Sequence, residues 1–202
     1  MTMSRVLKVM LVLTVTLFVA GCASKFKSDV ARFHQLPRPS GETFVVVPKD
    51  EAKKGSLEFA QYAAQIADRL SAYGYQRTRS EADADLVVRV DYGVDDGKTV
   101  VRSYPGTYGF YPYHFHHHFW PYYPGYGQTE IRSYVVYNRK LTMEIAAPSG
   151  EVLFEGRVIS QGRDNRLPEV MPYLIEAMFA DFPGQSGVTQ HVVIEEGGDG
   201  SY

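Results

Sequence analysis

The amino-acid sequence predicts an α+β fold: a single domain in which a mostly antiparallel sheet of about five strands carries two helices on one face. Several short segments alternate apolar and polar residues, as half-buried strands do. Two longer segments repeat apolar residues every three or four positions, as amphipathic helices do. The chain has 202 residues, of which 45% are hydrophobic. This is enough to build one hydrophobic core.

The first half of the chain predicts a strand, a helix and a second strand. Residues 43–47 form a β-branched run that Pro48 stops. Ser56 is a candidate N-cap for the helix that follows, and Gly74 supplies the left-handed residue that ends it. Residues 86–92 then alternate as a half-buried strand. A right-handed crossover would place the two strands parallel to each other.

The second half predicts a hairpin followed by a helix. Residues 141–145 and 152–158 alternate on either side of a Pro-Ser-Gly turn. Asn165 is a candidate N-cap for the second helix, whose apolar residues continue to Phe182. Pro172 removes a backbone amide, so we expect this helix to begin close to it.

The N-terminal segment ends in Val-Ala-Gly-Cys at residues 19–22, and Cys22 is the only cysteine. Arg5 and Lys8 precede an apolar run too short to span a bilayer. The segment resembles the lipobox of bacterial lipoproteins. The resemblance implies cleavage before Cys22, a diacylglyceryl thioether on its sulfur and usually a third acyl chain, such as palmitate, on its new amino group. An ordinary secretory peptide cleaved elsewhere is the alternative.

The same resemblance implies a cellular location. In Gram-negative lipoproteins the residue after the cysteine influences sorting, and Ala23 permits export to the periplasmic face of the outer membrane, in preference to the inner membrane or the cell surface. The mature chain would lose two of its 21 basic residues and none of its 23 acidic ones. Because it is mildly acidic, we expect no nucleic-acid partner. With Cys22 acylated, no thiol remains for disulfides or zinc.

The chain therefore divides into four predicted parts. These are a signal peptide (1–21), a lipidated N-terminus with a flexible leader (22–41), a folded domain (42–183) and an acidic, Gly-rich tail (184–202). Within the leader only residues 30–36 have the character of a strand, and within the disordered tail only residues 192–194 do. An aromatic and His-rich insertion interrupts the domain at 104–127.

Three passages carry a resemblance to a known family. They are Tyr-Gly-Tyr-Gln-Arg at 73–77, Ala-Asp-Ala-Asp-Leu-Val-Val at 82–88 and Ser-Gly-Glu-Val-Leu-Phe-Glu-Gly at 149–156. Together with the lipobox they resemble the bacterial lipoproteins of the DUF4136 family, from about residue 27 to 182. The residue types in these passages can be explained by packing alone. Gly156, for example, would leave room for a neighbouring side chain to pack over the strand. The resemblance thus implies a fold and a cellular location, but no activity.

The insertion is the strongest candidate for a binding surface. It lies between predicted strands near 98–103 and 131–139, and its prolines and glycines prevent long regular structure. Tyr and Trp combine an apolar ring with a polar group, so they are common at hydrated interfaces with lipid headgroups, glycan or protein. The candidate contact residues are Tyr108, Phe110, Tyr111, Tyr113, Phe115, Phe119, Trp120, Tyr122 and Tyr123.

Histidines in the insertion support an alternative function. His114, His116 and His118 are spaced by two, so in an extended chain their imidazoles share one face and could bind Zn²⁺ or Cu²⁺. No acidic residue in the insertion supplies a further ligand. We therefore expect no resident cofactor besides the lipid on Cys22.

Motifs of catalysis are absent from the sequence: there is no nucleophile elbow, phosphate loop, dinucleotide fingerprint or metalloprotease helix. The paired aspartates at 83/85 and 95/96 suit solvated turns, and His34 and His191 lack an orienting partner in the sequence. We expect a non-catalytic envelope lipoprotein that binds a protein, lipid or glycan partner. A periplasmic metal-binding protein is the alternative.

Overall fold

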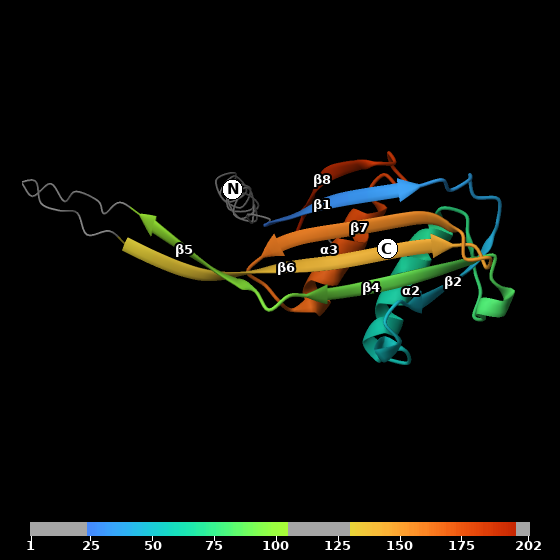
Figure 1. Cartoon of the computed structure of the whole chain (residues 1–202), viewed down its shortest axis with the longest axis horizontal. Helices are drawn as coiled ribbons and strands as arrows, with labels where there is room; N and C mark the ends of the chain where they lie inside the picture. Colours follow the sequence, from blue (N-terminus) through green and yellow to red (C-terminus); the bar gives the residue numbers. More distant parts are fainter. Residues whose placement is uncertain (1–23, 105–129, 197–202) are drawn as a thin grey trace, which may run out of the picture.

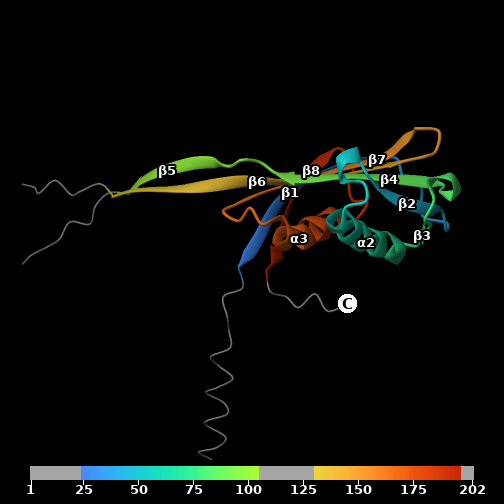
Figure 2. The same ribbon diagram turned by 90° about the horizontal axis from the view of Figure 1, so that it is seen from below.

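The computed structural model describes residues 24–104 and 130–196. In this part of the chain an eight-stranded mixed sheet carries two α-helices on one of its faces (Figures 1 and 2). The sheet order is β3-β2-β4-β6-β7-β1-β8, and β5 pairs only with β6. Strand β2 runs parallel to β3 and β4, and all other pairs are antiparallel.

The elements have the following bounds. The strands are β1 (Lys25–His34), β2 (Thr43–Pro48), β3 (Gln76–Arg77), β4 (Leu86–Val94), β5 (Lys98–Tyr104), β6 (Glu130–Ala146), β7 (Val152–Gly162) and β8 (Val188–Glu195). The α-helices are α2 (Leu57–Ala72) and α3 (Leu167–Phe179), and the 3₁₀ turns are η1 (Glu51–Lys53) and η2 (Glu81–Asp83).

The expectation of about five strands is too low, partly because full strands lie in the leader and the tail, where the sequence predicts only the short segments 30–36 and 192–194. Strand β1 occupies half of the supposed leader (22–41), and β8 lies in the supposed tail (184–202). Strand β1 pairs with both β7 and β8. Two of the buried positions of β1 are the polar residues Ser28 and Arg32. The alternation of apolar and polar residues that marks a strand is therefore hard to recognise in its sequence.

The predicted crossover from β2 through α2 to β4 is confirmed, with β2 and β4 parallel. The Ser56 hydroxyl caps α2 by accepting from the Phe59 amide at 3.3 Å. At the other end Gly74 has φ +104°, and the Tyr75 amide donates to the Leu70 carbonyl oxygen at 3.3 Å. Both sequence-predicted ends of this helix are therefore present.

Helix α3 begins earlier than the sequence predicts. Arg166, not Asn165, is its N-cap residue and makes no side-chain capping bond, and the helix continues through Pro172. Pro172 costs one backbone hydrogen bond. Seven buried residues outweigh that loss by packing on the sheet: Val170, Met171, Leu174, Ile175, Ala177, Met178 and Phe179.

The core fills the space between the helices and the sheet. The predicted hairpin is present as β6 and β7, with Leu141 opposite Val158 and Met143 opposite Gly156. A Cβ on Gly156 would lie 2.5 Å from the Met178 sulfur, so this glycine lets α3 approach the sheet closely. None of the buried core residues comes from β5 or from residues 130–136 of β6.

Candidate functional site

The β5–β6 arm, consisting of residues 98–104 and 130–136, projects beyond the end of the sheet (Figures 1 and 2). Residues 130–136 of β6 pair with β5 alone, whereas from Tyr137 onward β6 pairs with β7 and no longer with β5. The arm is therefore a two-stranded ribbon, a structure that is marginally stable by itself in water. Its free ends are joined in sequence by the aromatic and His-rich insertion.

The two faces of the arm differ in charge. Residues directly opposite each other in an antiparallel pair share a face. One face, the uncharged face, carries Thr99, Val101, Ser103, Ile131, Ser133 and Val135. The other, the charged face, carries Lys98, Val100, Arg102, Tyr104, Glu130, Arg132, Tyr134 and Val136.

Cation-π contacts order the charged face. The Arg102 guanidinium lies 5.8 Å from the ring centre of Tyr134, and Arg132 lies 5.7 Å from that of Tyr104. The guanidinium of Arg163, from the loop after β7, lies 4.2 Å from the ring centre of Tyr134. The uncharged face has no such internal partners, and Val101 and Ile131 are 63% and 69% exposed there.

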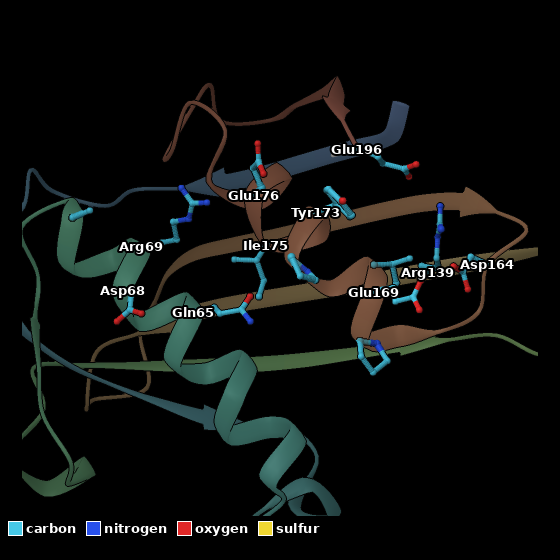
Figure 3. A pocket seen from close by; sticks show the side chains of 14 residues that line it. Gln65, Asp68, Arg69, Arg139, Asp164, Glu169, Tyr173, Ile175, Glu176 and Glu196 are labelled. Atoms are coloured by element: carbon cyan, nitrogen blue, oxygen red, sulfur yellow. The ribbon is translucent and has the colours of Figure 1, made fainter. Parts of the chain in front are cut away.

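A groove of about 1010 Å³ lies on the helical side of the domain, between α2, α3 and Arg139 of β6 (Figure 3). The charged residues of its lining are mainly acidic, with Asp68, Asp164, Glu169, Glu176 and Glu196 against Arg69 and Arg139. Asp164 is held by Arg166, which donates to it at 2.8 and 3.0 Å and lowers the pKa of its carboxyl group. The groove thus offers charge but no nucleophile with an adjacent base.

Arg139 forms part of the floor of this groove and is only 6% exposed. It donates to the Ser160 hydroxyl at 2.8 Å and lies 5.0 Å from the ring centre of Phe26. Burial lowers its pKa, and Asp164 and Glu196 oppose that change. These two carboxylates partly offset its charge, and its buried Nε makes no hydrogen bond within the described residues.

The face of the sheet opposite the helices carries paired charges. Asp91 binds Lys53 at 2.7 Å and Lys140 at 3.3 Å, and Glu144 binds Lys49 and Arg89, both at 3.1 Å. Burial raises the pKa of Asp91, but the hydrogen bonds and charges of the two lysines outweigh it and leave the pKa below its usual value. Charges paired in this way are typical of a solvated sheet face.

His34, His191 and two of the four paired aspartates have structural partners. His34 lies 3.0 Å from the Gly184 carbonyl oxygen, and His191 lies 3.0 Å from the exposed Asp29 carboxylate. Asp85 accepts from the Thr43 amide and hydroxyl, which lowers its pKa. Asp95 likewise accepts from Asn138 and Gly97 at the root of the arm. Contacts of this kind are typical of side chains that stabilise turns and strand ends.

The lipidation, metal-binding and partner-contact residues that the sequence predicts all lie outside the described residues. These are Cys22, the three histidines 114, 116 and 118, and the nine aromatic residues of the insertion. Within 24–104 and 130–196, no cluster of three or more metal-ligating side chains occurs. No helix in the same ranges is long and apolar enough to cross a membrane.

Sequence reasoning missed the two buried arginines and the two-faced arm. For Arg32 a signal existed, because Phe26, Ser28, Val30 and Arg32 alternate in register, but the flanking prolines favoured an irregular leader. For the arm, the missing information was the register of β5 against β6, which decides which residues share a face.

Comparison with known proteins places the chain in a family. The model of the family called Domain of unknown function (DUF4136) matches residues 29–184, so the chain belongs to the DUF4136 family. No functionally curated protein matches it.

Several solved structures are similar to this chain, each with low sequence identity. A PDZ domain protein from Parabacteroides distasonis has 14% identity and a TM-score of 0.47, over 89% of this chain and 41% of its own. The chain thus spans about two fifths of that protein. A PelC dodecamer from Paraburkholderia phytofirmans has 15% identity and a TM-score of 0.40, over 79% and 99%. A DUF4136 protein from Bacteroides thetaiotaomicron has 19% identity and a TM-score of 0.37, over 73% and 90%.

Proposed function

We propose that this protein is a non-catalytic lipoprotein, anchored through acylated Cys22 at the periplasmic face of the outer membrane. In this proposal the aromatic insertion contacts a protein, lipid or glycan partner. The observation that carries the proposal is the β5–β6 arm, which holds both ends of the insertion outside the core. A binding segment placed there can engage a partner without disturbing the packed domain.

The start of β1 also supports an anchor at Cys22. Lys25 is the first residue of β1, three positions after the cysteine. The backbone between them spans at most about 10 Å. The domain would then rest close to the bilayer, in place of the long flexible leader that the sequence predicts.

Replacing Cys22 tests the anchor directly. Cys22→Ser removes the sulfur that the acyl chains require, so the variant should take up no palmitate analogue in growing cells, whereas the wild type should be labelled. Ser24→Ala is the matched control, because it changes a hydroxyl two residues away and leaves the sulfur intact. Equal labelling of wild type and Cys22→Ser would contradict the proposal.

Metal binding through His114, His116 and His118 is the second candidate function, and their alternating spacing is the observation that favours it. Titration of the full mature chain with Zn²⁺ and Cu²⁺ measures it. A stoichiometric site that disappears when all three are replaced by Gln would make this the leading function.

A further inference from the structure

Strand β8 forms one edge of the sheet (Figure 1). Among the described residues it pairs with β1 alone, over its full length of eight residues. The Glu196 amide, which continues this ladder, donates to the Ser24 carbonyl oxygen at 2.7 Å, so these two residues form a hydrogen-bonded pair. Such pairs alternate along an antiparallel ladder. The residues whose backbone groups point away from β1, toward the free edge, are therefore Thr189, His191, Val193 and Glu195.

This edge lacks the features that usually prevent strands from pairing between molecules. Strand β8 contains no Pro, Lys or Arg, and half of its residues are Val or Ile. The other end of the strand order is β3, which has only two residues and includes Arg77. Of these two edges, β8 is therefore the one that can accept a further strand of useful length.

The side chains of β8 are complementary to those of a second β8 running in the opposite direction. When Val193 lies opposite Val193 of the second copy, His191 lies opposite Glu195 on the same face. On the other face Val192 then lies opposite Ile194. The neighbouring registers either place His191 opposite Val193 or leave it beyond the end of β8, so they lose this complementarity.

The charges on β1 extend the complementarity across four strands. His191 Nδ1 lies 3.0 Å from the Asp29 carboxylate, and its Nε2 makes no hydrogen bond within the described residues. Glu195 lies opposite Lys25 of β1. Two paired edges would therefore carry a row of Asp29, His191, Glu195 and Lys25, the last two from the second copy. Charge alternates along this row when His191 is protonated, and the two-fold symmetry repeats the row.

The same pairing is compatible with two membrane anchors. A two-fold axis between antiparallel edge strands is perpendicular to the sheet, so the helices of both copies lie on one side of the joined sheet. Figure 2 shows β1 beginning on the helix side. Three strand spacings and four residues along the strands would separate Lys25 from Lys25 of the second copy, which is about 20 Å. Both chains could then be anchored in one bilayer, although the pairing does not depend on the anchor.

We infer that the β8 edge is an interface between two copies of this chain. The two β8 strands pair antiparallel about Val193 and join the two sheets into one. The interface is isologous, because each copy contributes the same residues.

A disulfide at the two-fold axis tests the register. Opposite residues of a hydrogen-bonded pair have Cα atoms about 5.5 Å apart, within the range that a disulfide spans. Val193→Cys in the full chain should therefore form a covalent dimer in native membranes under mild oxidation. Thr189→Cys is the matched control on the same strand and face, because its two copies would lie about 27 Å apart along the strands. The wild type, whose only cysteine is Cys22, sets the background.

A charge at the axis tests the interface without a crosslink. Val193 is 47% exposed, so Val193→Lys should leave the circular dichroism and melting temperature unchanged. It places two ammonium groups opposite each other and should convert the dimer to a monomer in native mass spectrometry of the detergent-solubilised protein. Ile159→Lys is the control, because Ile159 is 38% exposed on β7, away from the edge, and this variant should stay dimeric.

Three results would overturn the inference. They are a monomeric wild type, a dimer that survives Val193→Lys, and crosslinking at residue 189 that equals or exceeds crosslinking at 193. A disulfide from residue 193 to a different protein, in place of a second copy, would assign the edge to another partner and also overturn it. Palmitate labelling of Cys22 is measured separately, so failure of the anchor and failure of the dimer are distinguishable.

Discussion

Arg32 joins three elements that are distant in the sequence. Its guanidinium donates to the carbonyl oxygens of Ala177, Met178 and Ala180 at distances of 3.0, 3.0 and 2.7 Å, and to Gln190 of β8 at 2.9 Å. The side chain is 1% exposed, and burial lowers its pKa. A cation at this end of α3 satisfies terminal carbonyls and opposes the negative end of the helix dipole.

Replacing Arg32 by Met keeps much of the volume and removes the donors. The buried carbonyls lose their partners, so Arg32→Met should lower the free energy of unfolding by about 3 kcal/mol. Urea denaturation measures the change. Arg157→Met, on the exposed face of β7, is the matched control and should change stability by less than about 0.5 kcal/mol. Equal stability of the two variants would mean that Arg32 is not the cap of α3.

Gly156 sets the distance between α3 and the sheet. A methyl group there would lie 2.5 Å from the Met178 sulfur and 2.7 Å from Phe154 Cε1. Gly156→Ala should therefore destabilise the protein by about 1–3 kcal/mol through overpacking. Gly93→Ala is the control, since a Cβ at that strand position meets no atom within 4 Å. Thermal unfolding measures the stability of both variants. A smaller loss of stability for Gly156→Ala than for Gly93→Ala would contradict the packing argument.

At the scale of elements, the two helices bury their apolar faces on one side of the sheet. Leu70 of α2 and Leu174 of α3 are 1% and 0% exposed, as their spacing in the sequence predicts. Replacing either by Ala should cost about 2–5 kcal/mol in the free energy of unfolding. Leu57→Ala is the control, because Leu57 is 89% exposed at the start of α2. Unchanged melting temperatures at both buried sites would show that the helix faces are misassigned.

The elements that sequence reasoning recovered are those whose signal is local. Helix α2 has a hydroxyl cap, a glycine stop and an uninterrupted apolar face, and the β6–β7 hairpin has clean alternation around a turn. Strands β1 and β8 were recognised only in part, as residues 30–36 and 192–194, because β1 is stabilised by pairing with β7 and β8, across more than a hundred residues. Local propensity carries little information about such long-range pairs.

The same distinction applies to the candidate site. A run of aromatic residues is visible in the sequence, so the insertion could be found there. The division of the arm into a charged and an uncharged face depends on Val101 lying opposite Ser133 and Arg102 opposite Arg132. A register shift of one residue would mix the two sets. Only the paired structure therefore reveals the uncharged face.

For the molecule as a whole, the packed domain and the arm have separate roles. The core lies between the sheet and the helices and contains no residue of β5 or of 130–136. Replacing residues 105–129 by a short Asn-Gly turn should therefore leave the domain folded, since Tyr104 and Glu130 already pair and a shorter loop costs less closure entropy. Circular dichroism and the melting temperature should match the wild type.

The same replacement should abolish binding to the envelope partner or surface that the wild type contacts. A variant with His114, His116 and His118 changed to Gln should retain that binding, because aromatic side chains supply the contact in the proposed function. Crosslinking and pull-down from the native envelope compare the two variants. Unfolding of the loop replacement would show that the aromatic residues belong to the core. Loss of binding in the Gln variant, with its fold intact, would instead show that the histidines are the functional groups of the insertion.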